Sequence, residues 1–84
     1  MKYWVKTMIG DKKIIDKLIE VKTPLTYPNF SSILRSICET VDLDTPLALP
    51  AHYKHLTRFN SVKFLPDDFI ARVDFDYLFI EAVG

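Results

Sequence analysis

An amphipathic stripe between residues 30 and 41 is the feature that most restricts how this chain can fold. Its apolar side chains recur every three or four residues, at the spacing of an α-helix: Phe30, Ile33, Leu34, Ile37, Cys38 and Val41. We expect a helix that begins at Pro28-Asn29, with Asn29 as the N-cap, and ends near Asp42. Because such a helix has one apolar face, it must lie across another layer of structure.

The two segments before the stripe have the composition of β-strands. Lys2 to Ile9 and Ile14 to Lys22 are rich in aromatic and β-branched residues, and the turn-like residues 10–13 separate them. This order predicts a β-hairpin. Odd-numbered apolar residues mark the expected core face of both segments: Tyr3, Val5 and Ile9 in the first, and Ile15, Ile19 and Val21 in the second. Odd positions must then pair with odd, which requires a loop of three or five residues.

A short helix, a short strand, a turn and a long strand are expected in the second half of the chain. Pro50 favours a short helix that continues to about Phe59. Ser61 to Leu65 predicts a short strand, and Pro66-Asp67-Asp68 predicts a turn. Phe69 to Ala82 predicts a long strand whose core-facing side is odd-numbered: Phe69, Ala71, Val73, Phe75, Tyr77 and Phe79.

The element order ββα(α)ββ predicts an α+β fold of two layers. We expect a mostly antiparallel sheet of about four strands, with one long and one short helix on one face. A chain of 84 residues has room for one core, so residues 1–84 are expected to form a single domain. Basic residues gather in the first strands and acidic residues in the last, which predicts that these strands are neighbours whose charges face each other.

One layer of helices leaves the second face of the sheet open, and large apolar residues are expected on that face. If the odd-numbered residues face the core, the even-numbered side chains point to the open face, and these include Trp4, Met8, Leu18, Leu78 and Ile80. Apolar residues that converge on the surface of a monomer usually mark a contact site. The sequence therefore favours a small protein-interaction module, which associates with itself as a homodimer or with another subunit through these residues.

The two histidines support an alternative, a ligand- or metal-binding protein that could be an enzyme. His52 and His55 are three residues apart, so they share one side of the short helix, and Asp67 and Asp68 add carboxylates in the following turn. Two histidines that simply pack at or near the surface explain the same spacing. No third ligand stands at a recognised spacing, so the pattern specifies little.

Other reactive residues each have an ordinary structural explanation. Cys38 could be a nucleophile beside a histidine, but its place on the apolar stripe favours a small buried side chain. Asp74 and Asp76 could act as a carboxylate pair, but on a strand they would face Lys2, Lys6 or Lys22 across the sheet. Trp4 between Lys2 and Lys6 could stack a nucleic-acid base.

Composition narrows the classes of partner and compartment. Eleven basic and eleven acidic residues cancel, so nucleic acid is not an expected partner. A single cysteine fits the cytoplasm, and we expect neither an export signal nor a membrane-spanning segment. No phosphate loop, paired cysteine motif or nucleophile elbow is present, so the sequence implies no cofactor and favours a protein without catalytic activity.

Overall fold

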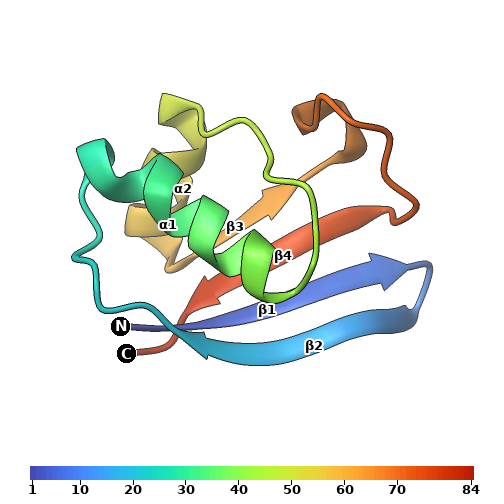
Figure 1. Ribbon diagram of the computed structural model, residues 1–84, viewed down its shortest axis with the longest axis horizontal. Coiled ribbons are helices and arrows are strands. Elements are labelled where there is room, and N and C mark those ends of the chain that lie inside the picture. The colour runs from blue at the N-terminus through green and yellow to red at the C-terminus, as the bar shows by residue number, and fades with distance from the viewer.

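The strands form one four-stranded antiparallel sheet in the order β2-β1-β4-β3. The computed structural model describes all 84 residues. Its strands are β1 (Lys2–Ile9), β2 (Lys12–Glu20), β3 (Ser61–Phe64) and β4 (Tyr77–Ala82). Its helices are α1 (Tyr27–Thr40), α2 (Pro50–Phe59) and the single 3₁₀ turn η1 (Pro66–Asp68). Figure 1 shows α1 and α2 on the same side of the sheet, which confirms the predicted two-layer α+β architecture.

The core lies between α1 and the covered face of the sheet. All six residues of the apolar stripe are buried, from Phe30 to Val41, as the helical spacing predicted. Tyr3 and Val5 of β1 meet them from the sheet with no exposed surface, and Leu56 adds a contact from α2. Neither helix has the length and apolar composition needed to cross a membrane. The sequence therefore identified the core-facing sides of α1 and β1.

The start of α1 differs from the prediction. The helix begins at Tyr27 with Thr26 in the N-cap position, and no side chain caps it. Asn29, predicted as the cap, instead uses its side-chain amide to donate to the Pro24 carbonyl at 3.1 Å. That bond fixes the chain before the helix rather than the free amides of its first turn. The short helix α2, by contrast, begins at Pro50 and ends at Phe59 as predicted.

The extra residue that the register of the β1–β2 hairpin requires does not lie where it was predicted. Odd positions do pair with odd, as Tyr3 with Ile19 and Thr7 with Ile15 show. The turn between the strands, however, contains only Gly10 and Asp11, so the predicted odd-numbered loop is wrong. The odd residue sits inside the strand, because Met8 pairs with Lys13 and the register shifts after Thr7. Ile14 is thus the extra residue of a β-bulge.

The last strand is shorter than predicted, and its even-numbered residues, not the odd-numbered ones, face the core. β4 begins only at Tyr77, because residues 69–76 form an irregular segment before it. Phe69 and Phe75 anchor that segment, since both rings are buried and meet edge to face at 5.4 Å between centroids. Within β4 the core side is even-numbered, with Leu78 opposite Thr7 and Ile80 opposite Val5.

The predicted charge pairing between the first and last strands is only half right. β1 and β4 are neighbours in the sheet, as the charge distribution suggested. Their facing residues do not form ion pairs, because Trp4 lies opposite Glu81 and Lys6 lies opposite Phe79. Lys13 pairs with Asp16 within β2, and the contact of His52 with Asp68 lies outside the sheet, so neither joins β1 to β4.

Candidate functional site

The face of the sheet opposite to the helices is uncovered and carries a group of large apolar side chains. Trp4 lies opposite Leu18 across β1 and β2, and Met8 lies opposite Tyr77 across β1 and β4. Phe79 stands on the same face of β4, two residues from Tyr77. We call these side chains the open-face cluster: Trp4, Met8, Leu18, Tyr77 and Phe79. Leu18 is 59% exposed and Trp4 37%, so much of this apolar area meets water.

Two residues that were predicted for this surface do not belong to it. Leu78 and Ile80 are fully buried against the helices, because the reversed phase of β4 turns even-numbered residues toward the core. Tyr77 and Phe79 take their places on the open face. The apolar run from residue 77 to residue 80 contains no polar side chain, so the sequence does not show which of these residues face the core and which face away. The prediction extended the phase of residues 69–75, which are not part of the strand.

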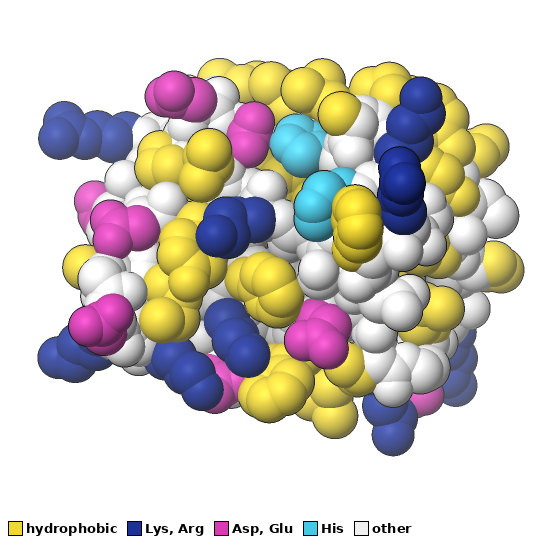
Figure 2. Space-filling view, turned by 180° about the vertical axis from the view of Figure 1, so that it is seen from behind, with side chains coloured by type: hydrophobic (Ala, Val, Ile, Leu, Met, Phe, Trp, Pro, Cys, Tyr) yellow, Lys and Arg dark blue, Asp and Glu magenta, His cyan; other side chains and the backbone are white.

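Lysine side chains lie over the aromatic rings of the open face. The Lys6 ammonium is 3.8 Å from the centroid of the Trp4 ring and 5.7 Å from that of Phe79. Lys63 of β3 places its ammonium 4.4 Å from the centroid of Tyr77. Exposed contacts of this kind contribute about 0.5–1 kcal/mol each. Figure 2 shows the result as hydrophobic side chains interspersed with lysine or arginine side chains across this side of the molecule.

A polar network holds Trp4 in place at one side of the cluster. The indole Nε1 of Trp4 donates a hydrogen bond to Oδ1 of Asp16 on β2. The other oxygen of Asp16 accepts from the Lys13 ammonium at 3.4 Å. The indole hydrogen bond lowers the pKa of Asp16 below its ordinary value; partial desolvation opposes the shift, and Lys13 and Lys6 add to it. Trp4 is therefore a positioned ring rather than a loose one.

A shallow hollow of about 220 Å³ lies within the same face. Met8, Tyr77 and Phe79 supply its apolar lining, while Lys6 and Lys13 supply its charge. The hollow therefore combines an apolar base with positive charge. Any surface that fits it needs an apolar projection, accompanied by a carboxylate or another acceptor.

His52 and Asp68 of the predicted ligand site do lie close together, but both side chains make contacts that hold the fold together. His52 Nδ1 accepts a hydrogen bond from the Leu49 amide at 3.2 Å, and the other ring nitrogen, Nε2, faces Asp68 at 3.6 Å. The same Asp68 oxygen accepts from the Leu65 amide at 2.8 Å. The contact ties the first turn of α2 to η1, and the His52 ring packs on Phe64 at 4.5 Å between centroids.

His55 and Asp67 do not join that pair. His55 Nδ1 is 2.7 Å from the Ser61 carbonyl oxygen, and its ring lies against Phe59 at 4.7 Å between centroids. Asp67 is exposed on η1. No three His, Cys, Asp or Glu side chains are grouped so that they could hold a metal ion. The two histidines share a helix but bond to different parts of the chain.

The remaining reactive residues are also accounted for by the fold. Cys38 is fully buried on the inner side of α1, and this burial raises the pKa of its thiol to about 11, which makes it a poor nucleophile. Asp74 and Asp76 lie before β4 rather than in it, so they do not face the lysines of a neighbouring strand as predicted. Asp76 instead accepts the Gly10 amide at 2.7 Å and so holds the hairpin turn.

The residues singled out from the sequence thus fall into two groups. Trp4, Met8 and Leu18 lie together on the uncovered face of the sheet, where Tyr77 and Phe79 join them. The histidines and Cys38 are engaged in packing and hydrogen bonds within the chain. The open-face cluster is therefore the strongest candidate site. No protein-family model, no curated protein and no solved structure matches this chain.

Proposed function

We propose that this protein is a small protein-interaction module that forms a homodimer through the open face of its sheet. The observation that carries the proposal is the open-face cluster, which runs across β2, β1 and β4 on the face that no helix covers. Exposed apolar side chains that gather on one face of a monomer, here with lysines among them, are typical of a contact surface. A stable interface buries about 800 Å² on each partner, roughly one seventh of the 5406 Å² surface of this chain.

The charges around the cluster favour a second copy of the chain as the partner. In a two-fold dimer the same patch meets itself, so a charged patch is self-complementary only if it carries both signs of charge. The open face has this property, because Lys6 and Lys63 share it with Glu81 and Asp16. Glu81 and Lys63 form no ion pair within the chain. Across a two-fold axis each can meet a charge of opposite sign.

The edges of the sheet are less suited to association than its face. β3 is an edge strand of only four residues, which offers few free backbone groups to a neighbour. β2 forms the other edge, and it carries Lys12, Lys13 and Lys17 together with a bulge. Short strands, lysines and bulges are the usual devices that stop one sheet from extending another. The side chains of the open face, rather than the backbone at the edges, are therefore the surface offered.

Nucleic acid fits this face less well than protein does. The chain has no net charge, and the lysine ammonium groups already lie over the rings on which bases would stack. Asp16 and Glu81 would also repel phosphate from the same surface. We place the protein in the cytoplasm, where its single buried thiol stays reduced.

Analytical ultracentrifugation over a range of concentrations tests this proposal. We expect the wild-type chain to approach twice its 9.8 kDa mass as its concentration rises. Leu18→Glu should shift the species toward monomer, because it places a charge at the most exposed apolar position of the cluster. Loss of a central contact costs about 2 kcal/mol or more, so the dimer should weaken by at least roughly thirtyfold.

Ile70→Glu is the matched control, because Ile70 is 90% exposed and lies outside the sheet. It makes the same kind of change from a large apolar residue to a carboxylate, and it should leave the dimer intact. A wild-type chain that stays monomeric at every concentration would remove the homodimer. A dimer that Ile70→Glu breaks and Leu18→Glu spares would move the interface away from the open face.

A further inference from the structure

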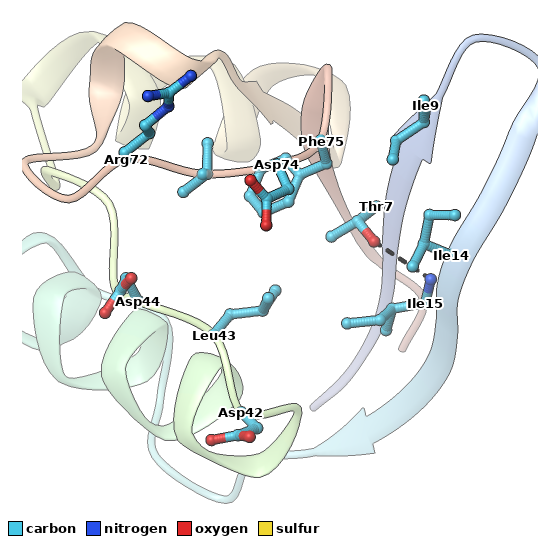
Figure 3. Close-up of a pocket in the computed structure, with 11 residues that line it drawn as sticks. Thr7, Ile9, Ile14, Ile15, Asp42, Leu43, Asp44, Arg72, Asp74 and Phe75 are labelled. Atoms are coloured by element: carbon cyan, nitrogen blue, oxygen red, sulfur yellow. Dashed lines mark hydrogen bonds between the residues drawn. The ribbon is translucent and has the colours of Figure 1, made fainter.

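A second apolar hollow lies on the other side of the sheet, at the end where the β1–β2 hairpin turns. Its volume is about 270 Å³, and Figure 3 shows its lining. Three segments far apart in sequence contribute apolar side chains: the hairpin, the loop after α1 and the segment before β4. These side chains are Ile9, Ile14, Ile15, Leu43, Val73 and Phe75. We call this hollow the bulge cavity.

The β-bulge builds one wall of the bulge cavity. Successive side chains of a regular strand point to opposite faces, yet the consecutive residues Ile14 and Ile15 both line this cavity. The extra residue at the bulge makes this possible. Thr7 stabilises the bulge from inside, because its hydroxyl oxygen accepts the Ile15 amide at 3.1 Å and the residue is only 1% exposed.

The apolar side chains of this wall are exposed to water, which is energetically unfavourable. Ile14 is 54% exposed and Ile9 is 45% exposed, although both are large aliphatic residues next to an apolar hollow. Nothing in the chain covers them. A partner that fills the hollow would remove this apolar area from water, which favours association.

The rim of the bulge cavity is acidic. Asp42, Asp44 and Asp74 stand around its mouth with a single Arg72, and none of the four forms an ion pair. Figure 3 shows Asp74 reaching into the opening, whereas the guanidinium of Arg72 points away from it. The mouth therefore carries an excess of negative charge beside an apolar interior. Its complement is an apolar group with positive charge next to it.

We propose that the bulge cavity is the docking site for a partner-protein segment that inserts an aliphatic side chain and carries lysine or arginine beside it. The volume favours a segment over a cofactor, since sites for whole small molecules usually measure about 300–1,000 Å³. A space near 270 Å³ accepts one or two side chains. The rim carboxylates then pair with the flanking cations, which selects basic over acidic segments.

This site is separate from the proposed dimer surface. The open-face cluster uses the even-numbered side chains of β1, whereas the bulge cavity uses Thr7 and Ile9 on the opposite side. A dimer joined through the open face therefore leaves the cavity accessible. Failure of one proposal does not affect the other.

Nuclear magnetic resonance titration of the ¹⁵N-labelled chain tests the site directly. The probe is the synthetic peptide acetyl-Lys-Leu-Lys-Leu-Lys-amide. Two matched peptides serve as controls, one with Glu in place of every Lys and one with Ser in place of every Leu. We expect saturable shifts at the amides of Ile14, Ile15 and Leu43 with the first peptide only, because only it supplies both the apolar and the cationic part.

Variants of the chain separate the apolar interior from the acidic rim. Asp74→Asn should weaken the Lys-Leu peptide about two- to fivefold, the effect of one exposed charge pair. Its control, Asp67→Asn, removes an exposed carboxylate outside the cavity and should change nothing. Ile14→Ser should weaken the peptide about tenfold, and Leu18→Glu on the open face should leave it unaffected. The spectrum of each variant shows whether it is folded.

Several results would overturn the site. The acidic peptide or the Ser peptide could shift the same amides as strongly, or no saturable shift could appear up to ~5 mM peptide. Shifts confined to the open-face cluster would move peptide binding to that surface. Hexylamine binding as tightly as the peptide would make the occupant a small amine. Shifts of the same amides on dilution of the protein alone would make it a second copy of this chain.

Discussion

The two hollows of this protein are similar in size and opposite in charge. The hollow in the open face measures about 220 Å³ and is edged by Lys6 and Lys13, while the bulge cavity measures about 270 Å³ and is edged by aspartates. Both are lined by β1, with Met8 in one and its neighbours Thr7 and Ile9 in the other. Apolar shape alone would not distinguish their partners. The sign of the charge at the rim does.

The two hollows also differ in how the backbone makes them. The open face is a regular ladder, in which cross-strand pairs such as Trp4 with Leu18 bring side chains together by simple alternation. The bulge cavity depends on an irregularity, the one residue by which β2 exceeds its partner. Single side-chain changes on the open face should therefore alter its contacts but leave its backbone unchanged, whereas the shape of the cavity should respond to changes in the backbone.

The largest effect on stability should come from a substitution on the core-facing side of β4, compared with one on its open side. Leu78→Ala should lower the free energy of unfolding by about 2–5 kcal/mol, because it opens a cavity in the core. Its neighbour Phe79 faces the open side and is half-buried. Phe79→Ala should therefore lower the free energy of unfolding less than Leu78→Ala does, and it should weaken the dimer more. Urea denaturation and sedimentation of both variants measure the contrast. Equal losses of stability would mean that the two faces are not distinct.

An intermediate effect should come from the bulge. Thr7→Val keeps the size of the side chain but leaves the Ile15 amide without its acceptor, which should cost about 1–3 kcal/mol. The amide shifts of Ile14 and Ile15 should change, whereas those of the open-face cluster should not. Thr57→Val is the control, because the Thr57 hydroxyl bonds the Tyr53 carbonyl on an exposed surface of α2. A Thr7→Val protein as stable as wild type would show that the hydroxyl does not support the bulge.

The smallest effect should come from Asp16 on the open face. The pKa of Asp16 is lower in the folded chain than its ordinary value of 3.8, chiefly because Trp4 donates to it. Its contribution to stability is thus fully present above pH 3.8 and is lost as the pH falls through the folded pKa. Fluorescence of Trp4, the single tryptophan, should titrate with a midpoint below 3.8.

The control for that titration is the pair Asp16→Asn and Asp11→Asn. The first should abolish the acid titration of the fluorescence, and the second should leave it unchanged, because Asp11 lies in the turn. A midpoint at or above 3.8 in the wild-type chain would contradict the hydrogen bond between the indole and the carboxylate.

Local patterns predicted most of the fold. The stripe from Phe30 to Val41 located α1 and its buried face, and Pro50 located the start of α2, because spacing and proline geometry act over a few residues. The hairpin followed from the same kind of signal. These predictions needed no information about distant parts of the chain.

The errors arose where distant contacts decide the outcome. Residues 69–76 alternate as a strand would, yet the packing of Phe69 against Phe75 makes them an irregular segment over the core. The phase of β4 is set instead by Thr7 and Val5 across the sheet. For the same reason three residues of the open-face cluster were predicted, Trp4, Met8 and Leu18, whereas Tyr77 and Phe79 were not.

The sequence indicated an extra residue in the hairpin, because odd positions had to pair with odd, but it did not show that this residue would form a bulge inside β2 instead of part of the loop. In genetic terms the bulge is one codon, that of Ile14. A gene without it would encode the same turn and the same pairing of odd residues beyond it, since Thr7 would still face Ile15 and Met8 would still face Lys13. A single in-frame deletion at this codon is thus enough to remove this wall of the cavity while the flanking pairs of the hairpin keep their partners.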